Sequence, residues 1–95
     1  METKIILNNN KGEVQAFEGE TPIGQLDFFI TDSLLSIEHT RTFEGYERKG
    51  VASTLVEAVT DYAMNNGLKI KPVCSYAQTW YIHNPQYKDI LTEGE

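Results

Sequence analysis

The sequence has few residues of several types, and each shortage excludes a class of protein. It contains a single cysteine, Cys74, which cannot form an internal disulfide. No apolar run approaches the roughly 20 residues that a membrane-spanning helix needs. The first residues have no basic region ahead of a long apolar one, as a signal peptide would. We therefore expect a soluble protein of a reducing, cytoplasmic compartment, with no membrane attachment.

Positive charge is also scarce. Eight Lys and Arg residues stand against 14 Asp and Glu residues, for a net charge of -6, which argues against general nucleic-acid binding. The two histidines and the cysteine lie at distant positions without metal-ligand spacing, so no metal site is expected. The GxSxG, GxGxxG and Walker motifs are missing as well.

The arrangement of apolar residues predicts a single domain over residues 1–95, with strands first and a helix afterwards. Short turns separate segments of strand character, which indicates an antiparallel meander. The expected strands cover residues 3–8, 13–18, 23–31 and 35–43. No helical period occurs before Gly50.

From about Gly50 to about Asn66, apolar residues recur at three- and four-residue spacing, which predicts an amphipathic helix that stops at Gly67. Residues 68–74 then predict a fifth strand, parallel to the fourth. Because Pro72 has no N–H group, pairing between these two strands should fail partway and leave a gap. Residues 77–83 should form a short helix, with Asn84-Pro85 starting another and residues 92–95 frayed.

The turn over residues 44–50 is a candidate anion site. The first N–H groups of a helix have no intrahelical acceptor, and the helix dipole adds partial positive charge there. Gly50 would let the backbone approach a ligand closely. The two arginines, Arg41 and Arg48, lie in this region with Lys49. The alternative is that the turn needs a glycine anyway and that the cations are simply solvated.

Cys74 is expected at the C-terminal end of the fifth strand, at the same sheet edge as Gly50. It is either a nucleophile or a small buried hydrophobic residue. A reactive role would need a cationic neighbour or a helix N-terminus. On the expected fourth strand, His39 and Arg41 share a face with the apolar Leu35 and Ile37. His39 is either a base or a histidine satisfied by the backbone.

Tyr76 follows Cys74 by two residues. It either belongs to the aromatic core or forms the wall of a cleft and offers a hydroxyl group. His83 is expected at the surface.

Residues 47–52, ERKGVA, resemble the Q/R-x-x-G-x-G/A pyrophosphate loop of the GNAT (GCN5-related N-acetyltransferase) superfamily. Gly50 and Ala52 match, whereas Glu47 and Arg48 depart from the pattern. The stretches HTRTF (39–43), GVASTLV (50–56), KIKPVCSY (69–76) and NPQY (84–87) are similar to a short, single-domain GNAT-like subgroup with a cysteine at the end of the fifth strand. The implied fold is α/β (α+β), with four antiparallel strands, a central helix, a parallel fifth strand and short C-terminal helices.

The resemblance implies acetyl-coenzyme A as the acyl donor and an unidentified amine, small molecule or protein, as the acceptor. The pantetheine arm would lie in the gap, paired with the main-chain groups of Arg41, Thr42 and Phe43 like an extra strand. The coenzyme-binding residues implied are Arg41, Thr42, Phe43, Arg48, Lys49, Gly50, Val51, Ala52, Ser53 and Asn84. The catalytic candidates are Cys74, His39 and Tyr76.

Two mechanisms fit this resemblance: direct attack by the amine, or transfer through Cys74. GNAT enzymes usually carry two helices between their first and second strands, and this sequence does not. The acceptor side should therefore be open, or completed by a second subunit or a protein substrate, and we expect a monomer or a weak homodimer. The alternatives are an acetyl-coenzyme A-binding module without efficient acceptor chemistry, and an interaction domain whose anion turn is incidental.

Overall fold

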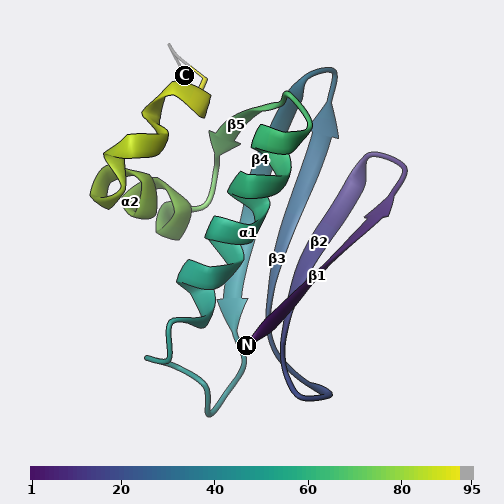
Figure 1. The fold of residues 1–95 in the computed structure, drawn as a ribbon, viewed down its shortest axis with the longest axis vertical. Coiled ribbons are helices and arrows are strands. Elements are labelled where there is room, and N and C mark those ends of the chain that lie inside the picture. The colour runs from purple at the N-terminus through teal and green to yellow at the C-terminus, as the bar shows by residue number, and fades with distance from the viewer. Residues whose placement is uncertain (93–95) are drawn as a thin grey trace.

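The computed structural model describes residues 1–92, and the expectation for the tail falls mostly outside this range. Five strands form one mixed sheet in the order β1-β2-β3-β4-β5 (Figure 1). The first four pair antiparallel, and β5 runs parallel to β4, as predicted. The strands are β1 (Glu2–Asn8), β2 (Lys11–Glu18), β3 (Thr21–Thr31), β4 (Leu34–Thr42) and β5 (Lys69–Pro72).

Two-residue turns connect the four antiparallel strands. Asn9, Gly19 and Asp32 each take a positive φ, of 60°, 64° and 56°. This geometry matches the twist of a tight hairpin, and glycine, asparagine and aspartate tolerate it best. Because the turns are this short, β2 and β3 begin two residues earlier than predicted.

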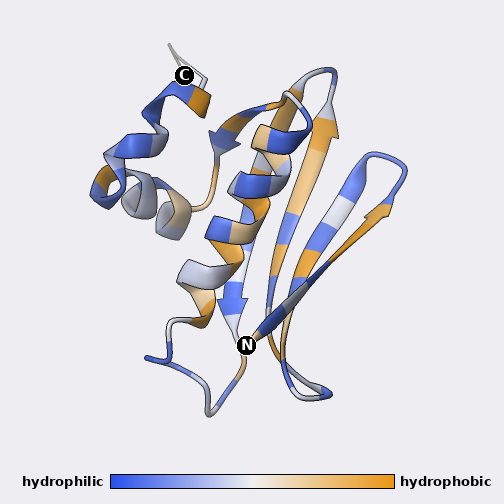
Figure 2. Ribbon diagram, viewed as in Figure 1, coloured by the Kyte–Doolittle hydropathy of each residue, from blue (hydrophilic) through white to orange (hydrophobic). Residues whose placement is uncertain are grey.

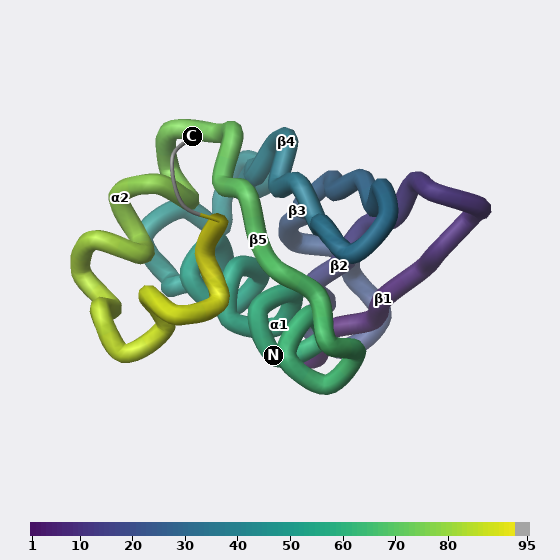
Figure 3. Tube along the Cα trace, turned by 90° about the horizontal axis from the view of Figure 1, so that it is seen from above, coloured from purple at the N-terminus to yellow at the C-terminus, as the bar shows by residue number. Residues whose placement is uncertain are grey.

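Helix α1 (Val51–Asn65) covers one face of the sheet. Its apolar stripe faces the strands (Figure 2), and Thr60 is the one polar residue of this helix that is buried. The predicted helix start is confirmed, and so is the predicted stop, where Gly67 takes a φ of 67°. Viewed from above, α1 lies on one side of the sheet, and none of the helices in residues 1–92 covers the other side of β1–β3 (Figure 3).

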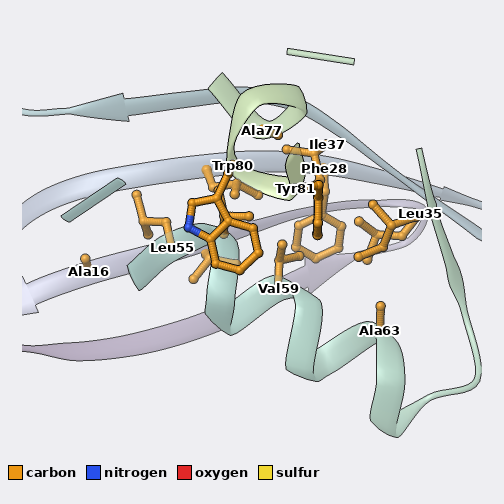
Figure 4. Packing of buried hydrophobic residues seen from close by; sticks show 14 of the residues in the cluster. Ala16, Phe28, Leu35, Ile37, Leu55, Val59, Ala63, Ala77, Trp80 and Tyr81 are labelled. Atoms are coloured by element: carbon orange, nitrogen blue, oxygen red, sulfur yellow. The ribbon is translucent and has the colours of Figure 1, made fainter. Parts of the chain in front are cut away.

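The core lies between α1 and the sheet (Figure 4). Its strand residues include Leu26, Leu35 and Ile37, all fully buried. Gly24 lets the first turn of α1 approach closely, because a Cβ atom there would lie 2.5 Å from Cγ1 of Val51. This contact holds the start of α1 against Gly24 of β3, which pairs with Thr42 at the end of β4.

The C-terminal part differs from the sequence prediction. The fifth strand was predicted over residues 68–74, but β5 ends at Pro72, and Cys74 already belongs to the next element. Proline cannot donate to the ladder, so the strand stops there. Helix α2 (Ser75–His83) therefore begins two residues earlier than predicted, and the 3-10 helix η1 (Pro85–Ile90) follows. None of the helices in the described part of the chain is long and apolar enough to cross a membrane.

A buried hydrogen bond connects α1 with α2. The hydroxyl groups of Thr60 and Tyr81 lie 2.6 Å apart, and the Thr60 hydroxyl also donates to the carbonyl of Val56. Burial raises the pKa of Tyr81 to about 12, and the hydrogen bond to Thr60 lowers this pKa by a smaller amount. This bond holds α2, and with it Cys74, against the body of the domain.

The raised pKa of Tyr81 predicts a loss of stability at high pH. Below pH 10 the phenol is neutral in both the folded and the unfolded chain. Between pH 10 and about 12 it ionises only in the unfolded chain, so the free energy of unfolding falls as pH rises. Urea titrations of the wild type and of Tyr81→Phe should show a steeper fall for the wild type in this range. If the free energy of unfolding falls equally with pH in both proteins, the pKa of Tyr81 is not raised in the folded chain.

Candidate functional site

The turn between β4 and α1 has the backbone geometry of an anion site. Arg48 and Gly50 take φ values of 66° and 77°, in the left-handed region. Successive amides in such conformations form concave, anion-binding surfaces. Gly45 donates its N–H to the carboxylate of Glu47, and this bond stabilises the first residues of the turn.

The N-terminus of α1 lacks any side-chain cap. Gly50 is the N-cap residue, and the first helical bond runs from the N–H of Thr54 to the Gly50 carbonyl at 3.0 Å. The N–H groups of Val51, Ala52 and Ser53 precede that bond, so they have no intrahelical acceptor. The first turn contains no acidic residue, and Lys49 lies nearby over the ring of Tyr46. These amides are available to an anion.

The predicted gap between β4 and β5 is present. Pairing ends at Ile37 and Pro72, and the carbonyl of Ile37 then accepts N–H bonds from both Val73 and Cys74, at 2.9 and 3.1 Å. Beyond this point β4 has no strand partner on that side within residues 1–92. A cavity of about 570 Å³ lies along the open edge, lined by Asp27, His39, Thr40, Arg41, Cys74, Ser75 and Tyr76.

A bulge in β4 corrects the predicted faces of the strand. Asp27 pairs with His39 and Phe28 pairs with Ile37, so Glu38 has no partner across the ladder. The extra residue reverses the alternation. His39 and Arg41 therefore do not share a face with Leu35 and Ile37, as was predicted; they lie on the face away from α1.

The bulge also changes which main-chain groups face the gap. The N–H of Phe43 donates to the carbonyl of Ile23 at 2.9 Å, so it points into the sheet. In an antiparallel ladder, alternate residues direct their main-chain groups to the same neighbour. Arg41 therefore also points to β3, and the groups of Thr40 and Thr42 point to the open edge. Of the predicted trio, Arg41, Thr42 and Phe43, only Thr42 presents its main chain to the gap.

Cys74 is the N-cap of α2 rather than a strand residue. Its sulfur accepts the N–H of Ala77 at 3.4 Å and lies 3.4 Å from the hydroxyl oxygen of Thr40. The side chain is half-buried and forms part of the cavity wall. The structure thus supplies the helix N-terminus that a reactive cysteine needs. The sulfur also lies beside the open edge of β4.

Tyr76 connects this cavity with the anion turn. Burial raises its pKa, partly offset by a hydrogen bond with Ser53, and nearby Cys74 raises it further. Ser53 lies in the first turn of α1 and also accepts the indole N–H of Trp80 at 2.8 Å. The phenol therefore stays protonated and can donate a proton.

Asn84 lies at the other end of α2. Its side-chain amide donates to the carbonyl of Trp80 at 2.8 Å, and it precedes Pro85 at the start of η1. The predicted N-cap position is confirmed, but its side chain makes no capping bond to η1. Its role as a coenzyme ligand stays a prediction.

Sequence reasoning did not identify Thr40 and Asp27. Thr40 contacts Cys74 only because of the bulge, and Asp27 reaches the site through cross-strand register with His39. No local pattern in the sequence indicates either the bulge or the cross-strand register.

Comparison with known proteins agrees with this geometry. A family model described as GCN5-related N-acetyl-transferase matches residues 13–90. Protein NATD1 of Gallus gallus is 28% identical over 65 residues, which cover 66% of this chain and 59% of the relative. Human Protein NATD1 is equally similar, with 58% of its length covered. This chain therefore matches less than two thirds of the length of these relatives.

Solved structures share the fold. The solution structure of a GCN5-like protein from Staphylococcus aureus superposes with a TM-score of 0.67 and 26% identity, covering 97% of this chain and 90% of that one. The PaiA N-acetyltransferase from Thermoplasma acidophilum, solved with coenzyme A, gives a TM-score of 0.65 at 18% identity, over 79% of this chain and 50% of that one. The family match spans most of the chain, and the chain belongs to the GCN5-related N-acetyltransferase family.

Proposed function

We propose that this protein binds acetyl-coenzyme A and transfers the acetyl group to an amine. The observation that carries the proposal is the continuity of two features along one strand edge. The uncapped start of α1 lies just beyond the end of β4, and the open edge of β4 leads from there to Cys74. The first suits a pyrophosphate, and the second suits an extended pantetheine arm.

An acidic ligand at the turn would be held mainly by main-chain amides, because Glu44 and Glu47 balance Arg48 and Lys49 within residues 44–50. Arg48 and Lys49 precede Gly50 and the free amides of α1, whereas the chain as a whole has a net charge of -6. The arm would pair with the main-chain groups of Thr40 and Thr42. Its thioester would then lie at the edge cavity, near Cys74 and Tyr76.

In the direct route, the nitrogen of a neutral amine attacks the acetyl carbon. The new C–N bond forms as the C–S bond of the thioester breaks, and coenzyme A leaves as a thiolate. The amine proton passes to His39 or to water, and the Tyr76 hydroxyl can protonate the thiolate. His39 lines the cavity from the face away from α1, and Tyr76 lines it from α2.

In the second route, Cys74 takes the acetyl group first. Its sulfur attacks the carbonyl, a new C–S bond replaces the old one, and the thiol proton goes to coenzyme A. The acceptor amine then cleaves the acetyl-cysteine and regenerates the thiol. The position of Cys74 at a helix N-terminus and on the cavity wall favours this route as a second candidate.

A rival function is coenzyme A binding without efficient transfer. It is favoured by residues 1–50, which contain no helix and so lack the two acceptor-side helices that GNAT enzymes usually carry. Turnover with any amine separates the two functions, because a binding module would bind the donor but would not release free coenzyme A thiol with an acceptor present.

Amide NMR tests the binding step. Titration with acetyl-coenzyme A should shift the amide signals of Arg48 and of residues 51–53, since these groups would contact the pyrophosphate. The amide of Gly19, in a similar turn elsewhere, should not move. An acetylated pantetheine lacking the pyrophosphate should shift Thr40 and Thr42 but not the turn. If acetyl-coenzyme A leaves residues 48–53 unchanged, the proposal is wrong.

A further inference from the structure

A second cavity, of about 680 Å³, lies on the sheet face that no helix covers in the described part of the chain. Its wall includes Glu13, Asp27, Glu38, His39 and the apolar side chains of Ile6 and Phe29. The volume is in the range of small-molecule pockets, roughly 300–1,000 Å³.

The sheet register places four of these residues in one row. Ile6 pairs with Glu13, Glu13 with Asp27, and Asp27 with His39, from β1 across to β4. Neighbouring strands lie about 4.8 Å apart, so Glu13 and His39 are separated by two strand spacings, or about 10 Å. The row leads from the outer part of the sheet to the edge of β4.

The two cavities meet at this row. Asp27 and His39 line both the cavity on the open face and the cavity that contains Cys74. A molecule lying along the row would therefore extend one end to the site where the thioester is proposed to lie.

The lining carries excess negative charge. It contains three carboxylates, from Glu13, Asp27 and Glu38, and one cationic side chain, that of Lys11. Glu13 accepts a bond from the amide of Gln15, and Asp27 from that of Gln25; none of the three carboxylates forms an ion pair within residues 1–92. The carboxylates are also not grouped closely enough to hold a metal ion, since the described residues contain no such cluster. Spaced carboxylates beside apolar walls match spaced ammonium groups on an alkyl chain.

We propose that the acceptor is a small linear diamine or polyamine that lies along this row. The inference rests on the proposed acetyl transfer and names its substrate class. One ammonium group binds at Glu13, the methylene chain crosses β3 beside Phe29, and the other amine reaches His39 and the thioester. The terminal ammonium loses its proton to His39 or water, and its nitrogen then forms the amide bond as coenzyme A leaves. The far ammonium stays charged throughout.

Binding can be measured without the donor. The probe is 1,7-diaminoheptane, whose extended nitrogen-to-nitrogen length is about 10 Å, and heptylamine is its matched monoamine. The diamine should shift the amide signals of Glu13, Asp27 and His39, and heptylamine should do so at least about fivefold more weakly. Equal effects of the two amines, or no shift in this row, would overturn the inference.

Turnover gives the second test, with acetylated product measured by mass spectrometry. Glu13→Gln should lower the ratio of kcat/KM for the diamine over heptylamine by about fivefold, because it removes one charge partner. Asp27→Asn is a second variant if the first folds poorly. Glu57→Gln, on the exposed side of α1, removes the same charge and should keep the wild-type ratio.

The outcomes separate this inference from the proposed function. If acetyl-coenzyme A shifts residues 48–53 but the diamine preference is absent, the substrate class is wrong and the donor site stands. If a lysine-bearing peptide is acetylated in clear preference to the diamine, the commitment to a small acceptor is wrong. If the donor does not bind, the proposed function itself fails, whatever the diamine does.

Discussion

Replacing Gly50 with valine is expected to weaken acetyl-coenzyme A binding by more than about tenfold. The φ of Gly50 is 77°, which a β-branched residue rarely adopts, so the turn must rearrange. Rearrangement would redirect the amides of Val51, Ala52 and Ser53 away from the ligand. A Cβ atom at Gly50 meets no protein atom within 4 Å, so the effect comes from backbone strain and from blocked ligand approach, not from core clashes. Calorimetric titration measures the loss.

The matched control is Gly19→Val. Gly19 has a φ of 64°, also with no protein atom within 4 Å of an added Cβ, and it lies in the turn between β2 and β3. Both variants should lose about 1–3 kcal/mol of stability through strain, but only Gly50→Val should lose binding. If both bind the donor like the wild type, the turn is not the anion site. Gly50→Ala extends the test should the valine variant fail to fold.

Arg48→Ala separates side-chain from main-chain contributions at the same turn. An exposed charge contact contributes about 1 kcal/mol or less, so affinity should fall only about two- to fivefold. A loss as large as that of Gly50→Val would mean that the guanidinium, rather than the amides, holds the phosphate.

Local signals explain why the turn at Gly50 and the start of α1 were predictable from sequence. The change from alternating to helical periodicity falls at Gly50, and the glycine marks the start of the helix. Both signals depend only on neighbouring residues, so they can be recognised without knowledge of the fold. The gap beside β5 was predictable for the same reason, because Pro72 lacks a donor wherever it is placed.

The details of the edge were not predictable. Strict alternation along β4 puts His39 and Arg41 with Leu35, and one unpaired residue, Glu38, reverses this. Whether a strand contains a bulge depends on its partner, which lies elsewhere in the chain. The row from Glu13 to His39 likewise exists only through register across three strands, so the sequence gives no sign of the cavity on the open face of the sheet.

Cys74 is expected to carry an acetyl group after incubation with acetyl-coenzyme A alone. Its sulfur lines the edge cavity and already accepts the N–H of Ala77, as a developing negative charge would require. Intact-protein mass spectrometry should show one added acetyl group, and alkylation of Cys74 should slow when the donor site is occupied. Absence of the adduct under conditions where the donor binds would leave direct attack as the only route.

Two substitutions separate the chemistry of Cys74 from its structural role. Serine is a favoured N-cap residue, so Cys74→Ser should keep the bond to Ala77 and the stability of α2 while losing the adduct. Cys74→Ala loses both the adduct and the cap, at about 1 kcal/mol of stability. Both variants should still bind acetyl-coenzyme A, because the turn at Gly50 is unchanged. If Cys74→Ala turns over an amine acceptor at the wild-type rate, the acetyl-cysteine is not an intermediate, and the sulfur serves only to cap α2 and line the cavity.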